Sequence, residues 1–309
     1  MRSRRSVGAG AAGALLLGLA VGCTPADDHS TTPTGGPTSA YSVLTGKPGA
    51  AGRVLAVKID NVAAARPQTG LNSADLVYAI EVEGGLSRLM AVFDSGHLPP
   101  VVGPVRSARE TDLQLLAQYD HPALAFSGAQ SKLLPVLRKS RELIARTGTA
   151  AFFRDSGRPA PHNEYLHPGG LADGAGRAQD IGLRFAAAPP AGGAPATTGA
   201  ASMPAARFSF AWNGAQYRVS MDGARSPWTA DNVIIQHVTV KESQYHSRTG
   251  FVPYSLTVGH GSATLLRDGR SYPLSWDRPG ATDGTAFTAH GRDVPLHPGR
   301  TWIVLAPAR

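Results

Sequence analysis

The chain has 309 residues, a formal net charge of +8 from 30 Lys and Arg against 22 Asp and Glu, and one cysteine, Cys23. The basic residues are spread along the chain without a Lys/Arg run, which argues against a nucleic-acid partner. A single cysteine also excludes a disulfide within the chain. The length is sufficient for two modest domains.

The first predicted element is a signal peptide over residues 1–22. A basic head with Arg2, Arg4 and Arg5 precedes an apolar run that is shorter than a transmembrane helix. The sequence LAVGC at 19–23 resembles a bacterial lipobox, in which the cysteine becomes the acylated first residue of the mature protein. We therefore predict that Cys23 carries acyl chains such as palmitate and anchors the protein to the outer side of the membrane. The alternative is a plain secretory signal followed by an unrelated cysteine.

Two stretches of unusual composition divide the remaining chain. Residues 23–40 are polar and rich in Thr, Pro and Gly, which predicts a disordered tether. Residues 186–206 form a Pro/Gly/Ala stretch without periodicity or charge, which predicts a linker. We therefore expect one domain over 41–185 and a second over 207–309.

Strand-like segments open the first of these domains. Residues 53–60 are apolar and end at a turn pair, and residues 74–82 and 86–94 flank Glu83 and two glycines, which predicts a hairpin. Helix-like segments follow, and this mixture predicts an α/β or α+β domain.

The helices of this domain are predicted from capping patterns and leucine spacing. Ser107 and Glu110 fit a capping box, and the leucines beyond them predict an amphipathic helix over 108–119. A strand over 122–128 comes next. Ser127 starts a second capping-box pattern and predicts a further helix.

The second half contains short β-type runs separated by Gly, Pro and Asp turns, which predict a mostly-β domain. The runs are 232–240, 254–259, 263–276 and 301–307. Asp268 and Gly269 predict a two-residue hairpin turn. All four tryptophans lie in this half, where we expect them to anchor the core.

Polar side chains that follow strands are the candidates for binding. In open α/β sheets, ligands lie beyond strand ends near helix N-termini, and guanidinium groups offer paired donors to phosphate or carboxylate. The predicted anion site comprises Arg88, Arg106, Ser107, Arg109, Arg154, Arg158, His162 and Asn163. The alternative is that these arginines form structural ion pairs with Glu81, Glu83, Glu110 or Asp112.

The sequence motifs indicate no cofactor and leave the catalytic residues unknown. The chain has neither a Gly-x-Ser-x-Gly elbow nor a Walker loop, and the histidines around Glu164 lack the spacing of a zinc site. A divalent metal is expected only if the protein is an enzyme. Asp75 and Glu83 would then be its candidate ligands.

Several motifs together resemble the YerB-like lipoprotein family. In the first half they are VKIDNVAAARPQTGLNSADLVYAIEVEGGLSRLMAVF, GPVRSAR and FFRDSGRPAPHNEY, and in the second half NVIIQHV, GHGSATLLRDGR and PLHPGRTWIVLAP. The resemblance implies a membrane-anchored extracytoplasmic protein with two domains. Both domains of that family are catalogued as being of unknown function, so the resemblance implies no chemistry.

A more remote resemblance concerns the LytR-CpsA-Psr phosphotransferases. Asp60, Asp75 and Pro104 to Arg106 fall in the order of their motifs, although no Asp follows Arg106 here. The resemblance implies an enzyme acting on polyprenyl-pyrophosphate-linked glycans. Arg88, Arg106 and Arg109 would clamp the pyrophosphate.

Three functions therefore remain open. The first is an envelope lipoprotein that binds an anionic envelope polymer or a cell-wall synthesis protein. The second is the phosphotransferase-like enzyme, and the third is a scaffold whose arginines are all held in salt bridges.

Overall fold

The computed structural model describes residues 40–246 and 250–308. The predicted signal peptide, Cys23 and most of the predicted tether lie outside the described residues. Within the described ranges, no helix has both the length and the apolar character needed to span a membrane.

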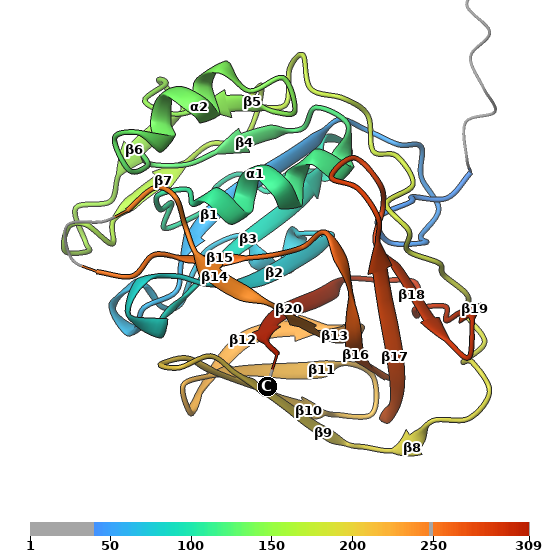
Figure 1. Cartoon of the computed structure of the whole chain (residues 1–309). Coiled ribbons are helices and arrows are strands. Elements are labelled where there is room, and N and C mark those ends of the chain that lie inside the picture. The colour runs from blue at the N-terminus through green and yellow to red at the C-terminus, as the bar shows by residue number, and fades with distance from the viewer. Residues whose placement is uncertain (1–39, 247–249, 309) are drawn as a thin grey trace, which may run out of the picture. The chain divides into compact units, whose positions relative to one another are not determined.

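The described residues form twenty strands and two α-helices (Figure 1). The helices are α1 Glu110–Leu116 and α2 Leu133–Lys139. The first strands are β1 Val54–Asp60, β2 Leu76–Glu81, β3 Ser87–Asp94, β4 Ala123–Ala125, β5 Ile144–Arg146, β6 Phe152–Arg154 and β7 Glu164–Leu166. The middle strands are β8 Ala194–Pro195, β9 Thr198–Ser202, β10 Arg207–Trp212, β11 Tyr217–Met221, β12 Ala224–Ala230 and β13 Asn232–Val238. The last are β14 Val240–Glu242, β15 Pro253–Ser255, β16 Gly259–Arg267, β17 Arg270–Arg278, β18 Ala286–Ala289, β19 Arg292–Asp293 and β20 Thr301–Pro307.

One twelve-stranded sheet contains strands from both halves of the chain. Its order is β19-β18-β17-β16-β13-β20-β2-β3-β1-β4-β5, and β8 pairs with β17 off this path. β20 lies between β13 and β2 and runs parallel to both. The two predicted domains are therefore joined through continuous main-chain hydrogen bonding rather than through a linker alone.

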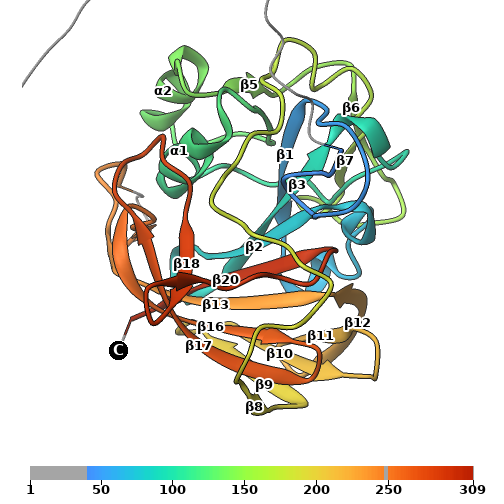
Figure 2. The same cartoon turned by 90° about the vertical axis from the view of Figure 1, so that its right-hand side faces the viewer.

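The large sheet lies between two layers. On one face, Tyr78 of β2 belongs to an apolar cluster with Leu115 and Leu137 of the two helices. On the other face, Ala79 packs in a cluster with Phe208 of the four-stranded sheet, whose order is β12-β11-β10-β9. Figures 1 and 2 show the helices and this smaller sheet on opposite sides of the large sheet.

The strand predictions are confirmed, but the fold is more strongly β than an α/β or α+β first half implies. β1, β2, β3 and β4 fall within the predicted segments, and β2 and β3 form the predicted hairpin. The two α-helices have only seven residues each. The tryptophan prediction is confirmed for Trp228, Trp276 and Trp302, which are buried.

Neither predicted capping box forms. Arg109, not Ser107, is the N-cap of α1, and the Asp112 carboxylate accepts the Arg109 backbone N–H at 2.7 Å. α2 starts later than predicted, because Gln130 rather than Ser127 supplies the acceptor for the first free N–H groups. At α1, Asp112 takes the role that was predicted for Glu110, and at α2, Gln130 takes the role that was predicted for the Ser127 hydroxyl.

The stretch 186–206 is structured, whereas the sequence predicted a linker. It contains β8, which pairs with β17, and β9, which pairs with β10. A Cβ on Gly199 would lie 2.2 Å from Leu266 Cδ1, so this small residue lets β9 approach the large sheet closely. This segment lacks large apolar residues of its own, and it is held by strand pairing and by contact with large side chains such as Leu266.

Candidate functional site

The ends of β1 and β3 bring several predicted site residues together. Side chains alternate along a strand, so Lys58 and Asp60 of β1 share the helix-facing side with Arg88 of β3. Asp60 and Arg88 are register partners. The segment before α1 covers this end of the sheet, because Arg106 N–H donates to the Lys58 carbonyl at 2.8 Å.

Two ion pairs hold α1 and its N-cap residue to β1 and to the turn between β2 and β3. Lys58 Nζ lies 2.6 Å from Asp112 Oδ1, and both side chains are fully buried. Burial lowers the pKa of Lys58 against the opposing effect of Asp112. Arg109 forms a bidentate pair with Glu83, with Nη2 2.7 Å from Oε1 and Nε 2.9 Å from Oε2. Burial raises the pKa of the Glu83 carboxyl, but the Arg109 pair outweighs burial and leaves that pKa below its usual value.

The third ion pair centres on Asp60, whose carboxylate is almost fully buried. Arg106 Nε lies 3.1 Å and His162 Nδ1 2.8 Å from Asp60 Oδ2.

Arg88 differs from its neighbours, because no ion pair to it exists in the described part of the chain. The Arg88 Nη1 group instead donates a hydrogen bond to the Ser107 carbonyl at 2.8 Å. Burial and the nearby Arg109 lower the pKa of Arg88 to about 9.

The remaining predicted binding residues lie on the β6–β7 hairpin and its loop. Arg154 Nη1 donates to Asn163 Oδ1 at 2.8 Å, and Arg158 donates to the carbonyls of Ala65 and Pro67. Arg154 and Arg158 also line a shallow pocket of about 430 Å³ with Tyr165. The eight predicted residues thus divide between the charged cluster and the β6–β7 hairpin, where Arg154 is exposed and Asn163 is buried.

The structure assigns ion-pair partners that the sequence identified only in part. Glu83 is a partner of Arg109, as the structural alternative predicted, but the partner of Arg106 is Asp60. Glu110 instead accepts hydrogen bonds from Ser243 and Gln244. Glu81 pairs with none of these arginines. Its Oε2 is buried without a partner among the described residues, and burial raises the pKa of this carboxyl.

The proposed metal pair, Asp75 and Glu83, does not form. Asp75 precedes the start of β2 and Glu83 follows its end. Eight residues of extended chain at about 3.3 Å each separate the two by roughly 25 Å. One ion cannot bind both carboxylates, and the described residues contain no group of three potential metal ligands.

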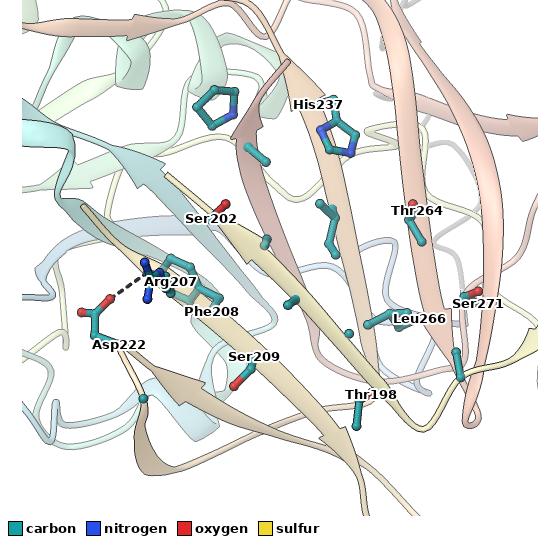
Figure 3. A pocket seen from close by; sticks show the side chains of 18 of the residues that line it. Thr198, Ser202, Arg207, Phe208, Ser209, Asp222, His237, Thr264, Leu266 and Ser271 are labelled. Atoms are coloured by element: carbon teal, nitrogen blue, oxygen red, sulfur yellow. Dashed lines mark hydrogen bonds between the residues drawn. The ribbon is translucent and has the colours of Figure 1, made fainter. Parts of the chain in front are cut away.

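A groove of about 1090 Å³ lies between β9 and the face of the large sheet. Figure 3 shows Thr198 and Ser202 along β9, opposite His237 of β13 and Thr264 and Leu266 of β16. Small side chains make up most of the β9 wall, so main chain is accessible along it. Sequence reasoning missed this groove, because alanine, glycine and serine carry no recognisable chemical motif.

The outer edge of β9 offers unpaired main-chain groups. β9 ends the four-stranded sheet, and no strand of the described ranges pairs with its outer side. Met203 N–H donates to Ala206 O, and Trp212 N–H donates to Thr197 O. Together with the register, these two bonds show which residue pairs of the β9–β10 ladder are hydrogen-bonded. In an antiparallel ladder, the residues between bonded pairs direct their N–H and C=O outward. These residues are Thr198, Ala200 and Ser202.

The fold and these sites define a β-rich protein with a charged cluster held in internal ion pairs and a groove beside an open strand. The chain belongs to the DUF3048 family, described as proteins of unknown function. The N-terminal domain of that family matches residues 44–181, and its C-terminal domain matches residues 198–303.

The relatives agree with this assignment. The chain is 35% identical over 116 residues to "Putative lipoprotein YerB" of Bacillus subtilis, a match that spans 37% of this chain and 34% of the relative. The sequence match thus covers about a third of that relative's length. The crystal structure of the YerB protein from Bacillus subtilis has the same fold, with a TM-score of 0.73 at 22% identity over 87% of this chain and 97% of that chain. The predicted YerB-like resemblance is confirmed, and the LytR-CpsA-Psr resemblance has no support in these comparisons.

Proposed function

We propose that this protein is an extracytoplasmic lipoprotein that holds an extended polypeptide segment of a cell-envelope partner in the groove beside β9. The open edge of β9 is the observation that carries the proposal. The lipobox-like sequence at Cys23 and the naming of the YerB relative support the envelope location.

An extended segment fits the chemistry of this edge. Thr198, Ala200 and Ser202 offer three N–H donors and three C=O acceptors at strand spacing, and a peptide that adds to a sheet edge uses such groups for affinity. The facing wall of the groove comes from β13, β16 and β20. An unpaired edge next to a groove can thus bind one strand.

The charges of the groove favour an acidic residue in the bound segment. Arg207 is exposed at the Ser202 end and forms no ion pair within the described ranges. Asp222 nearby is already paired with Arg66 at 2.6 Å. His237 lies half-buried on the opposite wall. The groove therefore carries an uncompensated cation at this end.

The test removes one outward N–H without disturbing the β9–β10 ladder. Ala200→Pro deletes the donor at an edge position that tolerates proline, and Ala200→Ser is the matched control that keeps it. A photo-crosslinking residue at Thr198 in living cells should capture an extended segment of one envelope protein. A synthetic peptide of that segment should bind the Ala200→Ser variant as it binds wild type and the Ala200→Pro variant at least tenfold more weakly.

Equal binding of the peptide to both variants, with both folded by circular dichroism, would show that the edge of β9 does not hold it. The anchor is tested separately by phase partitioning of wild type and Cys23→Ala. If Cys23 is lipidated, only wild type should enter the detergent phase, because Cys23→Ala removes the attachment site of all acyl chains. Stable membrane attachment needs more than one such chain.

A second candidate ligand is an anionic envelope polymer at Arg88. Arg106 and Arg109 both form ion pairs, whereas the Arg88 guanidinium has none among the described residues. The unpaired charge of Arg88 favours an anionic ligand. An anion that binds only the folded protein raises its melting temperature. Pyrophosphate should therefore raise the melting temperature of wild type and leave the melting temperature of the Arg88→Met variant unchanged. The enzyme alternative would need a metal beside these arginines, and Asp75 and Glu83 cannot hold one together.

A further inference from the structure

A polar cavity of about 610 Å³ lies at the opposite end of β2 from the charged cluster. Its walls come from the first described loop, from the residues before β2, from the turn after β3 and from the residue before β20. Those segments are 42–50, 72–75, 94–97 and Arg300. Neither the family description nor the groove proposal assigns any role to this cavity.

An aspartate orients a histidine in the wall of this cavity. Asp75 is 3% exposed, and its Oδ1 lies 3.0 Å from His97 Nε2. Asp75 Oδ2 accepts the Asp94 backbone N–H at 2.6 Å, so the carboxylate is fixed on both sides. The His97 side chain is about half exposed. Its Nδ1 makes no hydrogen bond within the described ranges and is free to meet a ligand.

Each carboxylate oxygen of Asp75 and Asp94 in the cavity already has a hydrogen-bond partner. Asp94 accepts N–H groups from Gly52 at 2.7 Å and from Gly96 at 2.8 Å. Asp75 is engaged as described above. The two carboxylates are therefore stabilised by these donors, while the exposed ammonium of Lys47 has no ion pair in the described residues.

Arg300 adds positive potential but not a free guanidinium fork. It donates from Nε to the Ala74 carbonyl at 3.0 Å and from Nη1 to the Thr229 carbonyl at 3.0 Å. Burial lowers its pKa. Among the basic side chains that line the cavity, Lys47 and His97 thus keep nitrogen atoms that are free for a ligand.

We propose that this cavity binds a phosphoryl group between Lys47 and His97. A carboxylate prefers the paired donors of a guanidinium fork, which Arg300 does not present, whereas a lysine ammonium serves phosphate as a point charge. A phosphate monoester carries about −1.5 to −2 charges and three acceptor oxygens, and a phosphodiester headgroup carries a single negative charge. Either group can accept hydrogen bonds from Lys47 and His97 at once.

Protonated His97 is the binding form. The groups that face it are Asp75, Asp94, Lys47 and Arg300. The hydrogen bond to Asp75 raises the pKa of His97, and burial and Lys47 oppose this effect without cancelling it. Affinity for phosphate should therefore be highest below that raised pKa and fall as the pH rises through it.

The experiment uses the intact chain in detergent micelles at constant ionic strength. Inorganic phosphate and glycerophosphoglycerol, the headgroup of a phospholipid, are titrated separately by calorimetry. The His97 ring resonance is followed by NMR over a pH series. The variants are Lys47→Gln and His97→Gln, with Lys132→Gln on the exposed start of α2 as the control.

We expect saturable binding of at least one probe, weakened at least tenfold by Lys47→Gln and by His97→Gln and unchanged by Lys132→Gln. Saturating probe should also move the His97 titration midpoint to higher pH. Tighter binding of glycerophosphoglycerol identifies a lipid headgroup as the source, and tighter binding of inorganic phosphate identifies a free phosphate monoester. Absence of saturable heat with both probes, equal binding by all variants or an unmoved His97 midpoint would overturn the proposal.

Discussion

Replacing Lys58 by methionine tests whether the charged cluster is part of the framework that holds α1 on the sheet. Lys58→Met keeps the length of the side chain but leaves the Asp112 carboxylate buried without a cation. Both side chains are fully buried and their charged atoms are 2.6 Å apart. Breaking such a pair costs about 3–5 kcal/mol. At about 2–4 °C per kcal/mol, the melting temperature should fall by about 6–20 °C.

The assay is urea unfolding, in which a changed midpoint at constant slope reports a change in stability. Lys58→Met combined with Asp112→Asn removes both charges and keeps an acceptor for the Arg109 N–H, so it should lose less stability than Lys58→Met alone. Arg184→Met breaks an exposed pair with Asp180 and is the matched control, with an expected loss below about 1 kcal/mol. The reasoning is refuted if Lys58→Met is no more destabilising than this control, or if the double variant loses the sum of the two single losses.

Three further outcomes are expected. Arg106→Ala leaves the buried Asp60 carboxylate with His162 alone, so thermal unfolding should show a loss of about 2–3 kcal/mol, below the full value for a buried pair because Arg106 is partly exposed and His162 remains; an unchanged melting temperature would mean that the pair is not stabilising. Gly85→Ala should destabilise by more than about 1 kcal/mol in urea unfolding, because φ is +69° and the new Cβ would lie 2.6 Å from Pro204 Cβ; wild-type stability would contradict this. Elastase should cut 186–206 only ahead of β8, because the later residues are paired in strands, and early cuts within β9 would contradict the strand pairing.

The strands could be predicted from the sequence because their apolar runs are bounded by clear turn signals. The Asp268-Gly269 turn, for example, has positive φ at both residues, as a two-residue hairpin requires. The pairing between halves could not be predicted. β20 reaches β2 across more than two hundred residues, and nothing local in either strand specifies a partner at that distance.

The candidate site was predicted in its residue types but not in its pairing. The arginines before α1 are clustered as the sequence implied, yet Arg106 takes Asp60 from a distant strand. Ion-pair partners depend on which strand ends the fold brings together, and one sequence does not show this. The groove beside β9 could not be predicted, because Ala200 and its neighbours have the composition of a linker. Their outward N–H and C=O groups are recognised only from the ladder with β10.

The place of β20 in the large sheet has a consequence for the order of folding. Synthesis starts at the N-terminus, so β2 and β13 are both made before the strand that pairs with them. Until residues 301–307 emerge, β2 and β13 each keep an unpaired edge, and such edges are prone to aggregation. The sheet can close only when almost the whole chain is available, and this high contact order implies slow folding. A chain truncated just before β20 would lose the strand pairing that makes the large sheet continuous between its two halves, and each half would be left with an open strand.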